Sequence, residues 1–286
     1  MTLLDDAALR ALSRLELGVS RRRTGGDGGR SAGRRGGRVE FAEHRAYAPG
    51  DDVRWIDWSA HARTGRLVVK EFEADEGLDV ALVLDTSGSM TTGGKLDAAR
   101  RLAYALGWVA LRSGARVRVA CASEVGLAAS DEVTGASGAA PHGDAIERAA
   151  GGGATRLSDS LAKLPHASRG ARLVVVLSDL LAADDGRRAI AVLAERGDDV
   201  VIVHVRAAAD LAAADEGDVI LEDAETGERV AADPLAPDRA RAFAAQQEAD
   251  WREFAARRRL RYVPVDAAAP FDVAMVRALR ASGVVA

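Results

Sequence analysis

Cysteine is almost missing from the sequence, and asparagine is missing altogether. Cys121 is the single cysteine among 286 residues, which excludes an internal disulfide and a zinc site built from cysteine thiolates. Long apolar runs are also missing: the longest candidate, 102–111, is too short for a membrane helix, which needs about twenty apolar residues. No hydrophobic signal core follows the N-terminus. We therefore expect a cytoplasmic protein without a membrane span.

Lysine is scarce as well, since Lys70, Lys95 and Lys163 are the only lysines among 39 basic residues. Arginine and alanine are abundant in return, a bias typical of GC-rich bacterial genomes, so the number of arginines does not by itself indicate nucleic-acid binding. The formal net charge of −4 excludes a global basic field, and we expect no specific nucleic acid as a partner. Hydrophobic residues make up 48% and charged residues 29%, a balance typical of a globular protein.

The beginning of the sequence divides into two segments of different character. Residues 1–20 repeat leucines at helical spacing, which predicts a helix with an apolar stripe at Leu4, Leu9, Leu12, Leu15 and Leu17. Residues 21–38 are dense in arginine and glycine, and such a composition cannot bury a core. We interpret this segment as a solvated basic linker, with contact to RNA or acidic lipid headgroups as the alternative.

From residue 78 onward, strand patterns alternate with helix patterns. Strands are predicted at 78–84, 116–122, 125–129, 173–177, 199–205 and 261–265, with a small hairpin at 218–231. Helices are predicted at 94–112, 143–150, 157–164, 184–196, 238–259 and 270–281, and a loop rich in glycine and alanine at 130–143. This order is typical of an α/β fold with a doubly wound, mostly parallel sheet covered by helices on both faces. The residues before it form an N-terminal extension.

Oxygen-bearing side chains follow two of the predicted strands. Asp85 ends the first strand of this region, and Asp179 follows its most hydrophobic strand. Ligands of open α/β sheets gather at the carboxyl ends of strands, so we expect both carboxylates at one edge. Ser87 and Ser89 follow Asp85 at alternate positions, and Thr155 comes after a run of glycines, just before a predicted helix. Two carboxylates and three hydroxyls form a hard, all-oxygen ligand set that suits Mg²⁺ or Mn²⁺.

Asp85-Thr86-Ser87-Gly88-Ser89 resembles the Asp-x-Ser-x-Ser element of the metal-ion-dependent adhesion site in von Willebrand factor A-like domains. Thr155 resembles the loop threonine of that site, and Asp179 resembles its second aspartate. The resemblance implies a von Willebrand factor A-like, Rossmann-like fold. It implies that Ser87, Ser89 and Thr155 bind the ion directly, whereas Asp85 and Asp179 bind it directly or through water. It also implies a non-enzymatic protein-binding module that depends on the metal.

The segment before this domain carries a second resemblance. Residues 41–58 read FAEHRAYAPGDDVRWIDW, and 62–64 and 69–73 continue the pattern. This stretch resembles the signature of the bacterial domain of unknown function 58 family. The resemblance implies an adaptor that acts with a MoxR-type AAA+ ATPase and a protein client. The predicted organisation is a helix at 1–20, a basic linker at 21–38, a signature segment at 39–76 packed on the domain, and a von Willebrand factor A-like domain at 77–286.

Charged and aromatic side chains gather between Tyr47 and Thr64. The charged side chains can pair with one another while Trp55, Ile56 and Trp58 bury the loop, and we interpret the block as structural packing. The alternative is a partner surface, because clusters of arginine and aromatic residues mark protein interfaces. The candidate surface consists of Arg45, Tyr47, Asp51, Asp52, Arg54, Trp55, Asp57, Trp58 and Arg63.

Other chemistries fit parts of the sequence less well than a metal-dependent binding module does. The segment 88–96 links a strand to a helix as a phosphate-binding loop does, but its spacing is one residue off and Leu96 stands where serine or threonine is required. A hydrolase that uses the same ion is an alternative, although the sequence shows no general base near the proposed ligands. Nucleic-acid binding through 21–38 is another.

His204, within an apolar strand, is predicted to be buried with its hydrogen bonds satisfied, and Cys121 is predicted to be a small core residue.

Overall fold

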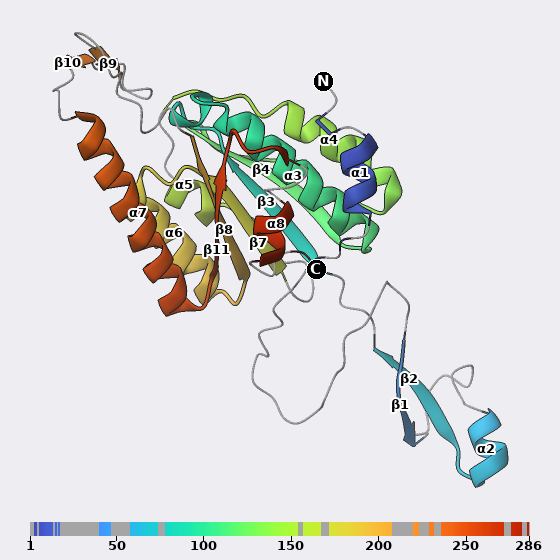
Figure 1. Ribbon diagram of the computed structural model, residues 1–286. Coiled ribbons are helices and arrows are strands. Elements are labelled where there is room, and N and C mark those ends of the chain that lie inside the picture. Colours follow the sequence, from blue (N-terminus) through green and yellow to red (C-terminus); the bar gives the residue numbers. More distant parts are fainter. Residues whose placement is uncertain are drawn as a thin grey trace. The chain divides into compact units, whose positions relative to one another are not determined.

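Figure 1 shows the computed structural model of the chain, which divides into two compact units, residues 1–30 with 78–286 and residues 31–77. The residues that the structure describes are 3–4, 6–13, 15, 17, 40–46, 58–73, 78–153, 157–166, 172–207, 220–222, 229–231, 236–271, 276–281 and 285. The predicted linker at 21–38 lies outside these residues. No described helix is both long and apolar enough to cross a membrane.

The smaller unit contains an antiparallel pair of strands and a short helix. β1 (Glu40–Ala46) pairs with β2 (Val68–Glu73), and their register shifts between Phe41 and Glu43. α2 (Trp58–Thr64) lies between the two strands in the sequence. Pairing of β1 with β2 therefore joins the two ends of the predicted signature segment.

Part of the predicted partner surface lies in these elements. Arg45 lies on β1, and Trp58 and Arg63 lie on α2 with exposed side chains. The prediction that Trp58 buries the loop is wrong, because its side chain is 61% exposed and contacts His61 edge-on. A helical side chain covers the turn before it, and Trp58 opens its helix, so no preceding turn of α2 lies beneath the ring. Tyr47, Asp51, Asp52, Arg54, Trp55 and Asp57 lie outside the described residues.

The larger unit is organised around a mixed sheet with the strand order β11-β8-β7-β3-β4-β5, in which β6 also pairs with β4. The strands are β3 (Asp79–Asp85), β4 (Arg116–Ser123), β5 (Gly126–Ala129), β6 (Val133–Thr134), β7 (Arg172–Ser178), β8 (Asp199–Arg206) and β11 (Arg261–Asp266). Pairing is parallel throughout, except that β5 and β6 run antiparallel to β4. The predicted mostly parallel sheet is confirmed. β3 and β7 are buried along their whole length, as expected of central strands with helices on both sides.

Helices cover both faces of this sheet (Figure 1). One face packs on α1 (Asp6–Leu12), α3 (Lys95–Arg112), α4 (Ala139–Glu147) and α8 (Val276–Ala281), and the other on α5 (Leu157–Ala162), α6 (Ala183–Glu195) and α7 (Ala236–Arg258). Side chains alternate along β3, so that Leu82 and Leu84 join the first core while Ala81 and Val83 join the second. The predicted hairpin is confirmed by the antiparallel pair β9 (Ile220–Glu222) and β10 (Arg229–Ala231).

Two segments of the larger unit differ from the predictions. The predicted loop at 130–143 instead contains β6, a short 3-10 helix and the beginning of α4. Alanine is the strongest helix former, and Pro141 is tolerated in the first turn of α4, so a helix starts earlier than the glycines suggested. The predicted helix at 1–20 ends at Leu12, and Leu17 forms an isolated antiparallel bridge with Val285. Pairing with a distant segment replaces further helical turns there.

Candidate metal centre

The predicted ligands lie where the direction of winding in the sheet reverses. β3 has β4 on one side and β7 on the other, so the connections that leave β3 and β7 diverge from each other. Asp85 is the last residue of β3, and Asp179 directly follows β7. Both aspartates are buried, and the charge of Asp179 acts on Asp85. The topology therefore brings together the two carboxylates that the sequence pattern placed at strand ends.

The Asp85 carboxylate is held at both oxygen atoms. Ser178 donates its hydroxyl to Oδ2 at 2.6 Å, and the backbone N–H of Ser87 donates to Oδ1 at 2.9 Å. Burial raises the pKa of Asp85 above its ordinary value; the two hydrogen bonds oppose this shift, and the negative charge of Asp179 adds to it. The structure thus holds a carboxylate with a fixed orientation in surroundings that favour a bound cation.

Ser87 and Ser89 direct their side chains to the same place. Their hydroxyl oxygens lie 3.0 Å apart, and both residues are buried. The loop keeps this shape because the backbone N–H and the hydroxyl of Thr86 both donate to the Ala122 carbonyl, at 2.9 and 2.7 Å. Ser89 then begins a short 3-10 helix, Ser89–Thr91. Two hydroxyls therefore converge beside Asp85, as the alternate spacing in the sequence predicted.

The glycine loop packs directly against the Asp85 loop. Gly88 donates its backbone N–H to the Gly153 carbonyl at 2.8 Å, and Gly152 donates to the Thr86 carbonyl at 2.9 Å. Gly153 has a φ of 72°, a left-handed conformation that favours glycine. The two loops are therefore neighbours, as predicted. Thr155 lies outside the described residues, so its role as a ligand stays a prediction.

A lysine that the sequence analysis left without a role lies beside these oxygens. Lys95 is the first residue of α3, and its ammonium donates to Oδ2 of Asp179 at 2.8 Å. The two side chains are 1% and 4% exposed. Lysine is almost never buried this deeply unless it is paired with an opposite charge. The pattern Gly93-Gly94-Lys95 at a strand-to-helix connection is the only sequence signal of this role, and it pointed first to a phosphate.

The loop after β7 is held by further hydrogen bonds. The Leu180 N–H donates to the Ser178 hydroxyl at 2.9 Å, and the Leu181 N–H lies 3.4 Å from Oδ1 of Asp179. Leu180 has a φ of 57°, in the left-handed region, and its carbonyl accepts a hydrogen bond from Gln247 of α7 at 3.0 Å. Both oxygens of Asp179 are therefore engaged, one by an ammonium and one by a backbone amide.

His204 lies next to this loop, a position that the sequence pattern did not indicate. It faces Ser178 in the β7–β8 register, is buried, and has its Nδ1 2.6 Å from the Tyr262 hydroxyl. Burial and the Arg206 charge lower its pKa to about 4, against the opposing effects of Asp179 and Glu248. The ring is therefore neutral at neutral pH. The prediction that His204 is buried with its hydrogen bonding satisfied is confirmed at this nitrogen.

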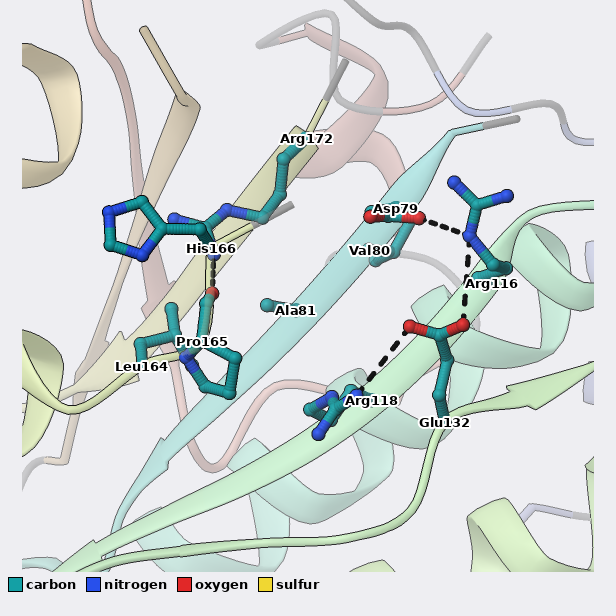
Figure 2. Close-up of a pocket in the computed structure, with 10 residues that line it drawn as sticks. All are labelled: Asp79, Val80, Ala81, Arg116, Arg118, Glu132, Leu164, Pro165, His166 and Arg172. Atoms are coloured by element: carbon teal, nitrogen blue, oxygen red, sulfur yellow. Dashed lines mark hydrogen bonds and ion pairs between the residues drawn. The ribbon is translucent and has the colours of Figure 1, made fainter. Parts of the chain in front are cut away.

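The opposite edge of the sheet carries charges that neutralise one another. Figure 2 shows a pocket there, in which Arg116 pairs with Asp79 and also reaches Glu132 at 3.6 Å. Arg118 lies 3.6 Å from the other oxygen of Glu132. The charges in this chain of contacts are matched, so we assign it a structural role.

The side chains at the Asp85 edge fit a hard divalent cation. The donors are a carboxylate and two converging hydroxyls, all oxygen, as Mg²⁺ and Mn²⁺ prefer. Within the described part of the chain, no three histidine, cysteine, aspartate or glutamate side chains form a group that could hold a metal. The case for an ion therefore depends on the serine hydroxyls as well as on the aspartates.

Comparison with known proteins shows the family to which the chain belongs. A family model described as "Protein of unknown function DUF58" matches residues 43–253. The chain belongs to this family. The DUF58 chain is 33% identical over 222 residues to the uncharacterized proteins Mb1516 of Mycobacterium bovis and Rv1480 of Mycobacterium tuberculosis, a match that covers 73% of this chain and 68% of each relative. The membership implied by the signature segment is confirmed.

One solved structure shows a weak likeness to the DUF58 chain. The PilB minor pilin from Streptococcus sanguinis matches it at 12% identity with a TM-score of 0.37. The match covers 76% of this chain and 62% of the pilin chain.

Proposed function

We propose that this chain is a metal-dependent protein-binding module, with a von Willebrand factor A-like domain whose adhesion site holds Mg²⁺ or Mn²⁺. The observation that carries the proposal is the convergence of the Ser87 and Ser89 hydroxyls, 3.0 Å apart, beside the Asp85 carboxylate. Paired serines in a fixed loop at a strand end provide neutral oxygen ligands, which leave positive charge on a bound ion.

Asp85, Ser87 and Ser89 would hold the ion directly, with Thr155 as a further ligand. Asp179 would act through water, because the Lys95 ammonium already neutralises its charge, whereas the Asp85 carboxylate accepts only from a hydroxyl and a backbone amide. Mg²⁺ prefers six oxygen ligands, so these residues leave coordination positions for a group from outside. A bound ion would supply the positive charge to which a carboxylate of another protein binds. The module therefore selects partners that present an aspartate or glutamate.

The proposed partners are a MoxR-type AAA+ ATPase and a protein client, with this chain as the adaptor between them in the cytoplasm. The resemblance of the signature segment supports this part of the proposal, and the chemistry of the site adds that the contact uses an acidic side chain. The hydrolase alternative needs a general base. His204 lies next to the site, but burial and Arg206 lower its pKa to about 4, and its Nδ1 already contacts Tyr262, so it is a weak base and the geometry does not favour that alternative.

Replacement of Asp85 tests the metal site. Calorimetric titration of the full chain with MgCl₂ is expected to show binding to the wild type and a loss of at least about a hundredfold in Asp85→Ala, because the charged ligand is gone. The matched control is Asp266→Ala, since Asp266 also ends a strand and accepts a loop amide, from Ala268 at 2.9 Å. Circular dichroism checks that both variants fold. Unchanged Mg²⁺ affinity in Asp85→Ala, or an equal loss in Asp266→Ala, contradicts the assignment.

A further inference from the structure

The Lys95–Asp179 ion pair gives the candidate metal centre a resident positive charge. The ammonium and the carboxylate lie 2.8 Å apart, and the side chains are 1% and 4% exposed. Gly94, in the left-handed conformation with a φ of 74°, turns the chain into α3 immediately before the lysine. The helix and the sheet thus bring this ammonium to the same edge that holds Asp85 and the two serines.

The ion pair does not separate easily. Removal of one partner from a buried pair leaves an uncompensated charge away from water, which costs several kcal/mol. The ammonium is therefore expected to stay on Asp179 when an ion binds at the Asp85 loop. This assigns the two carboxylates different roles, because Asp85 is available to a cation whereas Asp179 is already neutralised by Lys95.

A count of formal charges shows the consequence. Asp85 and Asp179 contribute two negative charges and Lys95 one positive charge, so the site carries −1 without a metal and +1 with a divalent ion. Without the lysine, the same site would carry −2 and become neutral when loaded. A site of charge +1 attracts a carboxylate more strongly than a neutral one, whereas a site of charge −1 binds the metal less tightly than one of −2.

We propose that Lys95 sets the selectivity of this site, weakening its hold on the metal ion and strengthening its hold on an incoming carboxylate. This inference rests on the proposed function, since it concerns the same ion. In the resulting site, Lys95 touches neither the metal nor the partner and acts by neutralising the charge of Asp179. It is a positioning and charge-setting residue. If the ion pair were merely structural, its loss would not change the affinity for the metal ion and the affinity for the carboxylate in opposite directions.

A set of charge variants tests this role in the full chain. Lys95→Met is expected to bind Mg²⁺ at least about tenfold more tightly than the wild type, equivalent to ~1.4 kcal/mol. The Mg²⁺-loaded variant is expected to bind acetate, the carboxylate probe, several-fold more weakly. Lys95→Met combined with Asp179→Asn restores the net charge and should return Mg²⁺ affinity to within about threefold of the wild type. Calorimetry measures the Mg²⁺ affinities, and titration followed by NMR measures acetate.

The matched control breaks a buried ion pair at the other end of β7. Arg172 pairs with Asp198 through Nε at 2.8 Å, and the two side chains are 4% and 7% exposed. Arg172 also donates to the Pro165 carbonyl, a contact that Figure 2 shows. Arg172→Met should lower the melting temperature, as loss of any buried pair does, and leave Mg²⁺ affinity at the wild-type value. A change in Mg²⁺ affinity there that equals the change in Lys95→Met overturns the inference.

The remaining outcomes separate the two proposals. If the wild type binds Mg²⁺ and Lys95→Met binds it equally, Lys95 is structural and the inference fails while the metal site stands. If only Lys95→Met binds Mg²⁺, the lysine takes the place of the ion in the native protein, which overturns the metal-dependent function and the inference that rests on it. If neither binds, both proposals fail. If Lys95→Met does not fold, Asp179→Asn is compared with the double variant that carries both substitutions. The double variant should then bind Mg²⁺ about tenfold more tightly than Asp179→Asn alone.

Discussion

Ser178 offers the most direct test of how the candidate metal centre is built, because it is not itself a proposed ligand. Its hydroxyl donates to Oδ2 of Asp85 at 2.6 Å and accepts the Leu180 N–H at 2.9 Å. Both contacts are buried. Ser178→Ala removes a single oxygen atom, so the change breaks two hydrogen bonds and leaves almost no cavity.

The expected cost follows from these two contacts. A hydrogen bond to a charged group contributes about 1.5–3 kcal/mol, and a neutral one about 0.5–1.5 kcal/mol. Ser178→Ala should therefore lower the free energy of unfolding by about 2–4.5 kcal/mol. The matched control is Ser160→Ala on α5: Ser160 is also 0% exposed, but its hydroxyl has no hydrogen-bond partner among the described residues. Loss of that hydroxyl should be neutral, or should stabilise the protein by up to about 1 kcal/mol.

Urea unfolding in EDTA measures both variants without any contribution from bound metal. The expected result is a lower midpoint for Ser178→Ala at an unchanged slope, and little change for Ser160→Ala. A loss below about 0.5 kcal/mol in Ser178→Ala, or equal losses in the two variants, would refute the reasoning, since the hydrogen bonds to Asp85 and Leu180 would then contribute nothing beyond burial.

Two further predictions concern the face that packs α3 against α4. A Cβ at Gly107 would overlap the His142 ring, so Gly107→Ala should lower the free energy of unfolding by about 1–3 kcal/mol, although alanine is the better helix former. In a protein that already carries His142→Ala, the same substitution should raise the free energy of unfolding. If Gly107→Ala alone stabilises the protein, the packing of this glycine against His142 is contradicted. Burial lowers the pKa of His142, so the unfolded state binds its proton first and the stability present above pH 6.5 is lost as the pH falls. Between pH 7.5 and 5.5, the free energy of unfolding measured in urea should fall by up to about 1.4 kcal/mol more in the wild type than in His142→Leu. Equal decreases in the two proteins would show that the ring takes up its proton equally in the folded and unfolded states.

Much of the fold follows from strong local signals. Leu173–Leu177 is an uninterrupted apolar run, and a strand of this kind must lie in the middle of a sheet with both faces covered. The residues after such a strand reach the carboxyl edge, so Asp85 and Asp179 could be placed together before any coordinates. Ser87 and Ser89 followed from their alternate spacing in a tight loop.

Other features depend on distant contacts that no local pattern reveals. Lys95 is hydrophilic and adjacent to glycines, and only the three-dimensional arrangement shows that its ammonium meets the Asp179 carboxylate, directly after β7. Ser178 and His204 come to the site through strand pairing rather than through a motif. The start of α4 was missed for a different reason, because glycines at 135 and 138 suggested a loop while Ala145 and Ile146 bury against the core.

The bridge between Leu17 and Val285 has a consequence for the way the larger unit forms during synthesis. Leu12 and Leu15 pack in the same buried cluster as Leu279 and Val285, although almost the whole sequence separates them. A ribosome releases the chain from its N-terminal end, so these leucines emerge early and can meet α3 long before the last strand and helix supply their remaining neighbours. Sheet formation can proceed in the meantime, because β3 pairs with β4 and β7 alone. Packing of Leu279 and Val285 onto these leucines is therefore a late step, and chaperones can bind the uncovered leucines until then.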